Sequence, residues 1–186
     1  MTQQNTKARI VEIAREIMVT DGVAGLSFDA IARRLGRSKQ AVLYWYPSKR
    51  DLLAALFLPA LEAEADVAIA ALEGVTGRAA AIGAFVDAVA RFHLADLERF
   101  RMMYLAPQMT PQRQDAPSLK DEVHPVTDRL YAALARHLDG DRAGALAVHA
   151  AVLGLVMMFA LADALNDPLK HGAGDAIAAL KARLSA

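Results

Sequence analysis

The segment 27–53 constrains the fold of this chain more than any other part of it. Its sequence, SFDAIARRLGRSKQAVLYWYPSKRDLL, contains helix-start and helix-stop residues at short intervals. Ser27 and Ser38 suit the capping position before a helix, because a serine oxygen accepts a hydrogen bond from an N–H of the first turn. Gly36 and Pro47 are residues at which helices end. The spacing predicts two short helices joined by a tight turn, at residues 28–35 and 39–45.

Two short helices connected in this way describe a helix-turn-helix, whose second helix reads the major groove of DNA. Ala32 is small enough to let the two helices approach closely, and the apolar residues expected to pack against the preceding helix are Ile31, Leu35 and Val42. The second helix then exposes a cation, an amide and aromatic groups, which suit base edges and phosphates: Lys39, Gln40, Tyr44 and Trp45. The alternatives are that Lys39 and Gln40 are ordinary solvated residues and that Trp45 is a wedge in the core or between domains.

The rest of the chain also shows helical periodicity and no alternating strand pattern. Apolar residues at helical spacing begin a first helix that should end near Gly22. Ser48 should cap a long helix running to about Gly74, which Pro59 should kink. Further helices are expected at 78–96, 98–106, 142–166 and 174–184. A loop is expected at 107–118, and it is followed by a helix that ends at about Leu138 and has Pro125 either at its start or at a bend. The predicted class is all-α, with about nine helices.

Composition and residue spacing argue against catalysis and cofactor binding. The chain has no cysteine, which excludes disulfides, thiol catalysis and cysteine-type zinc sites. None of its five histidines lies three or four residues from another, so no metal motif is present. No phosphate-binding loop, nucleophile elbow or paired-carboxylate pattern stands out. We therefore expect no enzyme, no metal site and no cofactor.

The charges are distributed unevenly, although the formal net charge of the whole chain is zero. Residues 1–51 hold nine lysines and arginines against five acidic residues, a net charge of +4, whereas the remainder has a net charge of −4. This asymmetry is typical of a protein in which one module touches phosphate. Arg33 and Arg34 contribute to this charge, either near phosphate or on a solvated face.

Residues 8–56 resemble the TetR family of bacterial transcriptional regulators. The resemblance rests on the first helix, the D-G-x-x-G-L-S-F-x-x-I-A segment, the G-x-S-x-x-x-V-L-Y helix and the P-S-K-R-D-L-L start of the fourth helix. It implies that Ser27 and Lys49 contact phosphate, that Lys39 and Gln40 contact bases, and that Tyr44 reaches the DNA backbone or a base. The complete set of expected DNA contacts is Ser27, Arg37, Ser38, Lys39, Gln40, Tyr44, Trp45 and Lys49.

Two positions depart from the family pattern. The family usually has a tyrosine at the position of Leu43, and in this chain the tyrosine follows one residue later, at Tyr44. Asp29 stands where some members have a basic residue that reads bases. The resemblance therefore implies weak base readout from the helix that carries Asp29. Tyr46 matches a position where the family has an apolar aromatic residue, which implies that it belongs to the core.

The same resemblance implies two functions for the helical body. Its last two helices would form a homodimer, through Leu146, His149, Ala150, Leu153, Met157, Leu161, Ile177, Leu180 and Leu184. It would also bind an apolar or amphipathic small molecule, through Phe85, Val89, Phe92, His93, Met102, Met103, Tyr104, His149, Met157 and Phe159. The polar groups to test first as ligand anchors are Arg91, His93 and His149. The alternative for each of these methionines and polar groups is an ordinary core, surface or hydrogen-bonded role.

The expected organisation is a helix-turn-helix DNA-binding domain at 1–48 and a helical effector-binding and dimerisation domain at 49–186. The expected function is a ligand-responsive repressor that binds a palindromic operator in double-stranded DNA as a homodimer and is released by a small-molecule effector. The alternative is an activator, or a regulator controlled by a protein partner. The polar start MTQQNTKARI and the absence of an uninterrupted apolar span predict a cytoplasmic protein without a membrane partner.

Overall fold

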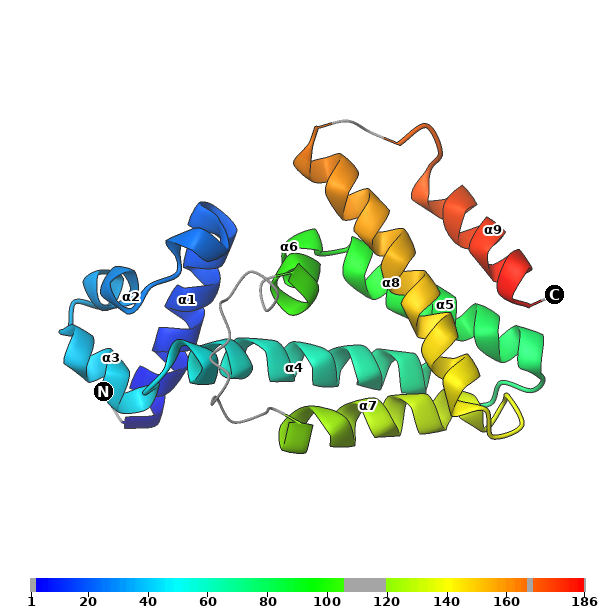
Figure 1. Cartoon of the computed structure of the whole chain (residues 1–186), viewed down its shortest axis with the longest axis horizontal. Coiled ribbons are helices and arrows are strands. Elements are labelled where there is room, and N and C mark those ends of the chain that lie inside the picture. Colours follow the sequence, from blue (N-terminus) through cyan, green and yellow to red (C-terminus); the bar gives the residue numbers. More distant parts are fainter. Residues whose placement is uncertain (1–2, 106–119, 167–168, 186) are drawn as a thin grey trace. The chain divides into compact units, whose positions relative to one another are not determined.

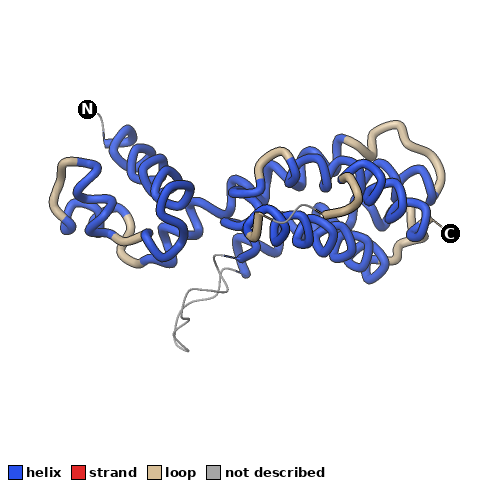
Figure 2. Tube along the Cα trace, turned by 90° about the horizontal axis from the view of Figure 1, so that it is seen from above, coloured by secondary structure: helices blue, strands red, loops and turns tan. Residues whose placement is uncertain are grey.

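The computed structural model describes residues 3–105, 120–166 and 169–185. Within these residues the chain is all-α, as predicted, with nine α-helices, one π-helical turn and no strand (Figures 1 and 2). The predicted loop at 107–118 lies outside them. The elements are α1 (Gln3–Gly25), α2 (Phe28–Leu35), α3 (Lys39–Trp45), α4 (Lys49–Ala70), α5 (Arg78–Leu94), α6 (Leu97–Phe100), the π-helical turn η1 (Arg101–Leu105), α7 (Lys120–Ala135), α8 (Arg142–Ala164) and α9 (Ala173–Leu184).

The described residues form two compact units, and α4 contributes to both. The first unit contains residues 3–60 and 101–105, and the second contains 61–100, 120–166 and 169–185. The chain passes from one to the other inside α4, which is a single helix that continues through Pro59. The predicted domain boundary at 48/49 stays a prediction, because the compact units share this helix.

The short helices α2 and α3 begin and end at the predicted residues. The Ser27 hydroxyl accepts a hydrogen bond from the N–H of Ala30 at 3.1 Å, and the Ser38 hydroxyl accepts one from the N–H of Ala41 at 3.3 Å. Gly36 ends α2 in the left-handed conformation, with φ 67°, which a residue with a Cβ adopts at a cost. Local hydrogen bonds therefore define both helices of the helix-turn-helix.

Several predicted helix ends differ from the observed ones. The first helix breaks at Gly22, as predicted, where φ is 67° and ψ is −177°, but a further helical turn continues to Gly25. The fourth helix ends at Ala70 rather than near Gly74, because residues 71–74 form a turn. The predicted helix at 98–106 is divided into α6 and the wider turn η1. Such π-helical turns interrupt the regular hydrogen-bond ladder and often occur at functional sites.

The core of the second unit lies between α5 and α8, with α7 and α9 packed beside them (Figure 1). Phe85 and Val89 of α5 and Val152 and Val156 of α8 are fully buried. The helix α8 is apolar on nearly all sides, and by length and composition alone it could cross a membrane. One third of the 18-residue apolar stretch of α8 is buried inside the unit. The predicted absence of a membrane partner therefore stays a prediction.

Candidate nucleic-acid interface and buried polar cluster

The helix α3 presents three polar side chains on one side and an apolar one on the other. Lys39, Gln40 and Tyr44 are exposed, and Tyr44 keeps 73% of its surface accessible. Val42, which lies on the opposite side of the helix from Gln40 and Tyr44, is fully buried. Arg37 and Ser38 are exposed in the turn before α3, and Ser27 is exposed before α2. All eight predicted DNA-contact residues are described, and six of them are exposed.

The displaced tyrosine is the accessible aromatic residue of α3. Leu43 is half-buried, whereas Tyr44 extends into solvent. Trp45 is half-buried and packs edge-to-face against Tyr44, with ring centroids 5.1 Å apart. A half-buried indole supports the Tyr44 ring and leaves the phenol free to reach outward.

The side of α2 and α3 that faces away from solvent is apolar. One of the three predicted core residues is less buried than expected. Ile31 and Val42 are fully buried, as predicted, but Leu35 is only half-buried, because it lies in the last turn of α2 next to the exposed Gly36. Tyr46 is buried, and its hydroxyl donates to the carbonyl of Lys7 at 3.5 Å. Burial raises the pKa of the Tyr46 phenol, because it disfavours the charged form.

Lys49 is the first residue of α4 and stands at a capped helix start. The Ser48 hydroxyl accepts from the N–H of Asp51 at 3.2 Å, while the Ser48 N–H donates to the Asp51 carboxylate at 3.0 Å. This reciprocal arrangement is a capping box. Lys49 is half-buried, and its positive charge stands at the helix end where the backbone dipole is also positive.

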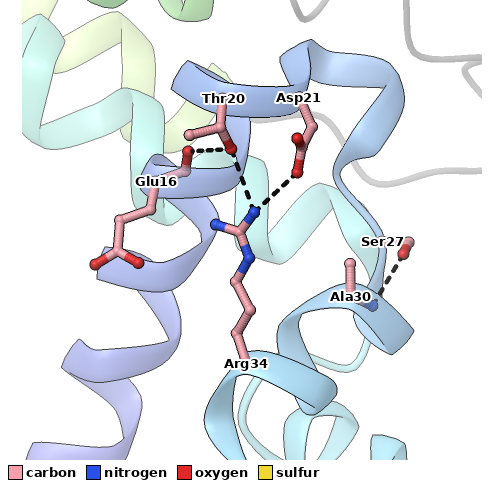
Figure 3. Close-up of polar contacts among 6 residues, drawn as sticks. All are labelled: Glu16, Thr20, Asp21, Ser27, Ala30 and Arg34. Carbon is pink, nitrogen blue, oxygen red and sulfur yellow. Dashed lines mark hydrogen bonds and ion pairs between the residues drawn. The ribbon is translucent and has the colours of Figure 1, made fainter.

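Ion pairs engage Arg34, Arg9 and Lys39 among the described basic side chains of the first unit. Figure 3 shows the guanidinium of Arg34 on α2 donating to the Asp21 carboxylate at 2.9 Å and to the Thr20 hydroxyl at 3.3 Å. Arg9 pairs with Glu12 on the same helix at 2.8 Å. The Lys39 ammonium contacts the Asp29 carboxylate at 2.8 Å. Of these three, only Lys39 belongs to α3.

A chain of buried polar side chains joins four helices of the second unit. The Glu64 carboxylate of α4 is 2.7 Å from Nε2 of His149 on α8 and 3.2 Å from Nε2 of His93 on α5. The other ring nitrogen of His149 is 3.1 Å from the Tyr131 hydroxyl of α7. Glu64 and His93 have no exposed surface. We call these four residues the Glu64 cluster.

The Glu64 carboxylate is held in its ionised form. Desolvation is the largest effect on it and opposes ionisation, but hydrogen bonds and charge interactions with His149 and His93 together outweigh it. They lower the pKa of Glu64 from 4.5 to about 2. Burial and the nearby Glu64 charge both raise the pKa of the Tyr131 phenol, so that Tyr131 stays neutral and can donate its proton in a hydrogen bond.

Only some of the residues predicted to bind the effector lie in the second unit. Phe85, Val89, His93 and His149 are buried in the second unit, and Phe92, Met157 and Phe159 are half-buried there. Met102, Met103 and Tyr104 lie in η1, which belongs to the first unit. Arg91 is exposed on α5. The buried polar anchors among the predicted residues are therefore the two histidines.

The predicted dimer residues divide into exposed and buried ones. Leu146, Ala150 and Leu161 are exposed on α8, and four others are half-buried: Leu153, Met157, Leu180 and Leu184. Ile177 and His149 are buried inside their own unit, His149 by its bonds within the Glu64 cluster. These two residues are therefore removed from the proposed contact surface.

Sequence reasoning missed Glu64 and Tyr131. A signal for Glu64 was present, because it lies three residues after Leu61 and four before Ala68, on the buried side of α4. A carboxylate at a core position needs partners, and in this fold the partners are histidines far away in the sequence. Within the described residues no group of histidines and carboxylates is arranged to hold a metal ion.

Sequence comparison places the similarity at the N-terminus. Residues 10–56 match the family described as "Bacterial regulatory proteins, tetR family". HTH-type transcriptional regulators of Mycobacterium bovis and Mycobacterium tuberculosis are each 44% identical to this chain over 66 residues, which is 36% of this chain. The match covers only 27% of the length of these relatives.

Solved structures share the whole fold at low sequence identity. PfmR, a TetR family transcriptional regulator from Thermus thermophilus, has a TM-score of 0.66 at 24% identity over 95% of this chain and 96% of its own. A tetR-family regulatory protein from Rhodococcus has a TM-score of 0.73 at 17% identity, over 100% and 96%. The multidrug binding protein EbrR, solved with imidazole, has a TM-score of 0.66 at 20% identity, over 96% and 93%.

Proposed function

Because residues 10–56 match the family described as "Bacterial regulatory proteins, tetR family", we propose that the chain is a member of this family and a ligand-responsive DNA-binding repressor. It acts as a homodimer on a palindromic operator, and a small-molecule effector releases it. The observation that carries the DNA-binding part is the exposed side of α3, where a 73% accessible tyrosine lies beside Lys39 and Gln40. An aromatic ring beside a cation and an amide on one exposed helix suits base edges and phosphates.

A second copy of the chain is the proposed occupant of the exposed side of α8. Leu146, Met158 and Leu161 each keep 51% of their surface accessible, at the spacing of one helical stripe. The buried side of α8 carries His149, which is hydrogen-bonded to Glu64, so that side belongs to the core of the unit and is unsuited to hydrocarbon. A two-fold dimer through α8 and α9 would present two copies of α3 to successive major grooves, about 34–36 Å apart.

The proposed effector site lies near the Glu64 cluster. Its surroundings are apolar and aromatic, with Phe85 edge-on to His149 and Phe100 edge-on to His93. Such a lining with few polar groups suits an apolar or amphipathic molecule with one polar end. The likeness to EbrR, a multidrug binding protein solved with imidazole, supports a body that accepts small molecules.

The helix α4 supplies the proposed coupling between effector and DNA. It starts at Lys49 in the first unit and carries Glu64 in the second. A molecule that changes how Glu64 is paired with His149 and His93 therefore acts directly on the helix that begins at the DNA-contact surface. The coupling requires that the effector bind the released state more tightly than the DNA-bound state.

The test of this function is a DNA mobility shift with the region upstream of the chain's own coding sequence, with and without added metabolites. We expect a retarded complex that a subset of apolar or amphipathic compounds dissociates. Retardation that no compound changes would favour the partner-controlled alternative. If the protein retards neither this region nor any duplex selected from a random-sequence pool, the DNA-binding proposal is wrong.

Replacing Lys49 with alanine should weaken binding to all DNA sequences to a similar extent. The lost phosphate contact should reduce the slope of log affinity against log salt by about 0.9. Titrations by fluorescence anisotropy at several salt concentrations measure both quantities. Arg136→Ala, which removes an exposed cation from the body, is the matched control and should leave the slope unchanged.

Replacing Gln40 with alanine should instead relax specificity at one base position. A bidentate amide contact to adenine discriminates against other bases by about 1–3 kcal/mol. Affinities for operators with each base pair substituted in turn would reveal the position. A uniform loss across all these operators, as expected for Lys49→Ala, would assign Gln40 to the backbone instead.

A further inference from the structure

The helix α2 places a carboxylate against the first residue of the proposed recognition helix. Asp29 lies in the first turn of α2, and its carboxylate contacts the Lys39 ammonium at 2.8 Å. The two side chains keep 62% and 49% of their surface accessible. The pair is therefore open to a ligand that approaches α3 and is not part of the core.

This pair changes what the exposed surface can bind. An ammonium has three donor hydrogens, and Asp29 engages one of them, so two remain for acceptors such as O6 and N7 of guanine. A carboxylate can only accept, and in the major groove it suits the amino groups of cytosine or adenine. Towards a phosphate, the same carboxylate is repulsive, and it partly cancels the attraction of Lys39.

The other ion pairs of the module do not have this consequence. Arg34 and Asp21 join α2 to α1 (Figure 3). Arg9 pairs within α1, so neither pair includes a residue of α3. Among the ion pairs of the described residues, only Asp29–Lys39 places a negative charge next to a residue proposed to contact bases. Asp29 is thus poised to influence which DNA sequences Lys39 accepts.

We infer that Asp29 is a specificity-determining residue of the DNA interface, an inference that rests on the proposed DNA-binding function. It positions the Lys39 ammonium for a base acceptor and lowers the affinity of the module for DNA that offers only phosphates. The family resemblance implied that α2 contributes little to base recognition. In this proposal Asp29 of α2 contributes indirectly, because it positions Lys39.

The test compares Asp29→Asn with wild type on two duplexes of equal length. One is an operator, taken from the upstream region or selected from a random-sequence pool, and the other is its scrambled sequence. Asparagine keeps the shape of the side chain, removes its charge and replaces one acceptor oxygen with an NH2 donor. We expect the affinity of Asp29→Asn for the scrambled duplex to be about threefold to tenfold higher than that of wild type, while operator affinity changes less. For the scrambled duplex, the slope of log affinity against log salt should become steeper by about 0.9, the contribution of one phosphate contact.

A second measurement separates positioning from a general charge effect. Wild type should discriminate among bases at one operator position, and Asp29→Asn should lose that discrimination as Lys39→Ala does. The matched control is Asp21→Asn, which removes the charge of another exposed carboxylate, paired with Arg34, and should leave both the specificity ratio and the base preference as in wild type.

The inference is overturned if wild type distinguishes operator from scrambled DNA and Asp29→Asn keeps the same ratio and base preference. It is also overturned if Asp21→Asn produces the same change, because the effect would then be one of total charge. If wild type binds neither duplex, the proposed function itself has failed, and that outcome differs from both of these.

Discussion

A charge placed in the exposed side of α8 should convert the protein into a monomer and lower its operator affinity by a factor of about 10² to 10⁴. The variant is Leu161→Glu, at a side chain that keeps 51% of its surface accessible in the single chain. In a two-fold dimer, the new carboxylate would lie within an apolar contact, where an unpaired charge is costly. Each monomer would then bind one half-site without the gain in effective concentration that a joined pair has.

The measurements are the molar mass by light scattering and the operator affinity by anisotropy. Val67→Glu introduces the same charge at another exposed apolar residue of the body, on α4, and should leave the dimer intact. Since both sites are exposed, both variants should keep the helical circular dichroism of wild type. A Leu161→Glu protein that remains dimeric at the wild-type concentration would show that α8 is not the dimer contact.

Replacing Glu64 with alanine should lower the free energy of unfolding by about 3–5 kcal/mol, the usual cost of removing one partner from a buried charged network. Glu64 has no exposed surface, and its carboxylate is hydrogen-bonded to His149 and lies 3.2 Å from Nε2 of His93. Without it, two buried imidazoles lose their acceptor and a cavity remains among four helices. Urea unfolding followed by circular dichroism measures the difference. Glu62→Ala, at an exposed position two residues earlier, should change stability by less than about 0.5 kcal/mol.

Acid titration of the same site gives an independent check. The pKa of Glu64 is lowered from 4.5 to about 2, so its stabilisation is complete above about pH 4.5 and is lost as the pH falls towards 2. The full shift corresponds to about 3 kcal/mol. Glu64→Gln cannot ionise, so its unfolding free energy should fall less steeply than that of wild type between pH 5 and pH 3. Parallel acid dependences in the two proteins would mean that the Glu64 carboxylate is not held by the histidines.

The amino-acid sequence by itself determined the local structure of the N-terminal module. Serines 27 and 38, Gly36 and the Ser48–Asp51 pair act on backbone groups within a few residues of themselves. Such interactions are present in the sequence pattern, so α2 and α3 could be bounded to the residue. The helix count of the body followed in the same way from apolar periodicity, while helix ends in longer segments were less well defined, as at α4 and α6.

The tertiary structure alone decided which residues meet. Glu64 and His149 are 85 residues apart, and they touch only because α4 and α8 pack in one core. The same packing determines which side of the largely apolar α8 stays exposed, and it buries His149 of α8 and Ile177 of α9 inside their own unit. The Asp29–Lys39 contact likewise depends on how α2 and α3 cross, because side chains ten residues apart on different helices have no fixed distance in the sequence. The helix-turn-helix was thus readable from local hydrogen bonding, whereas the groups proposed to tune it depend on long-range packing.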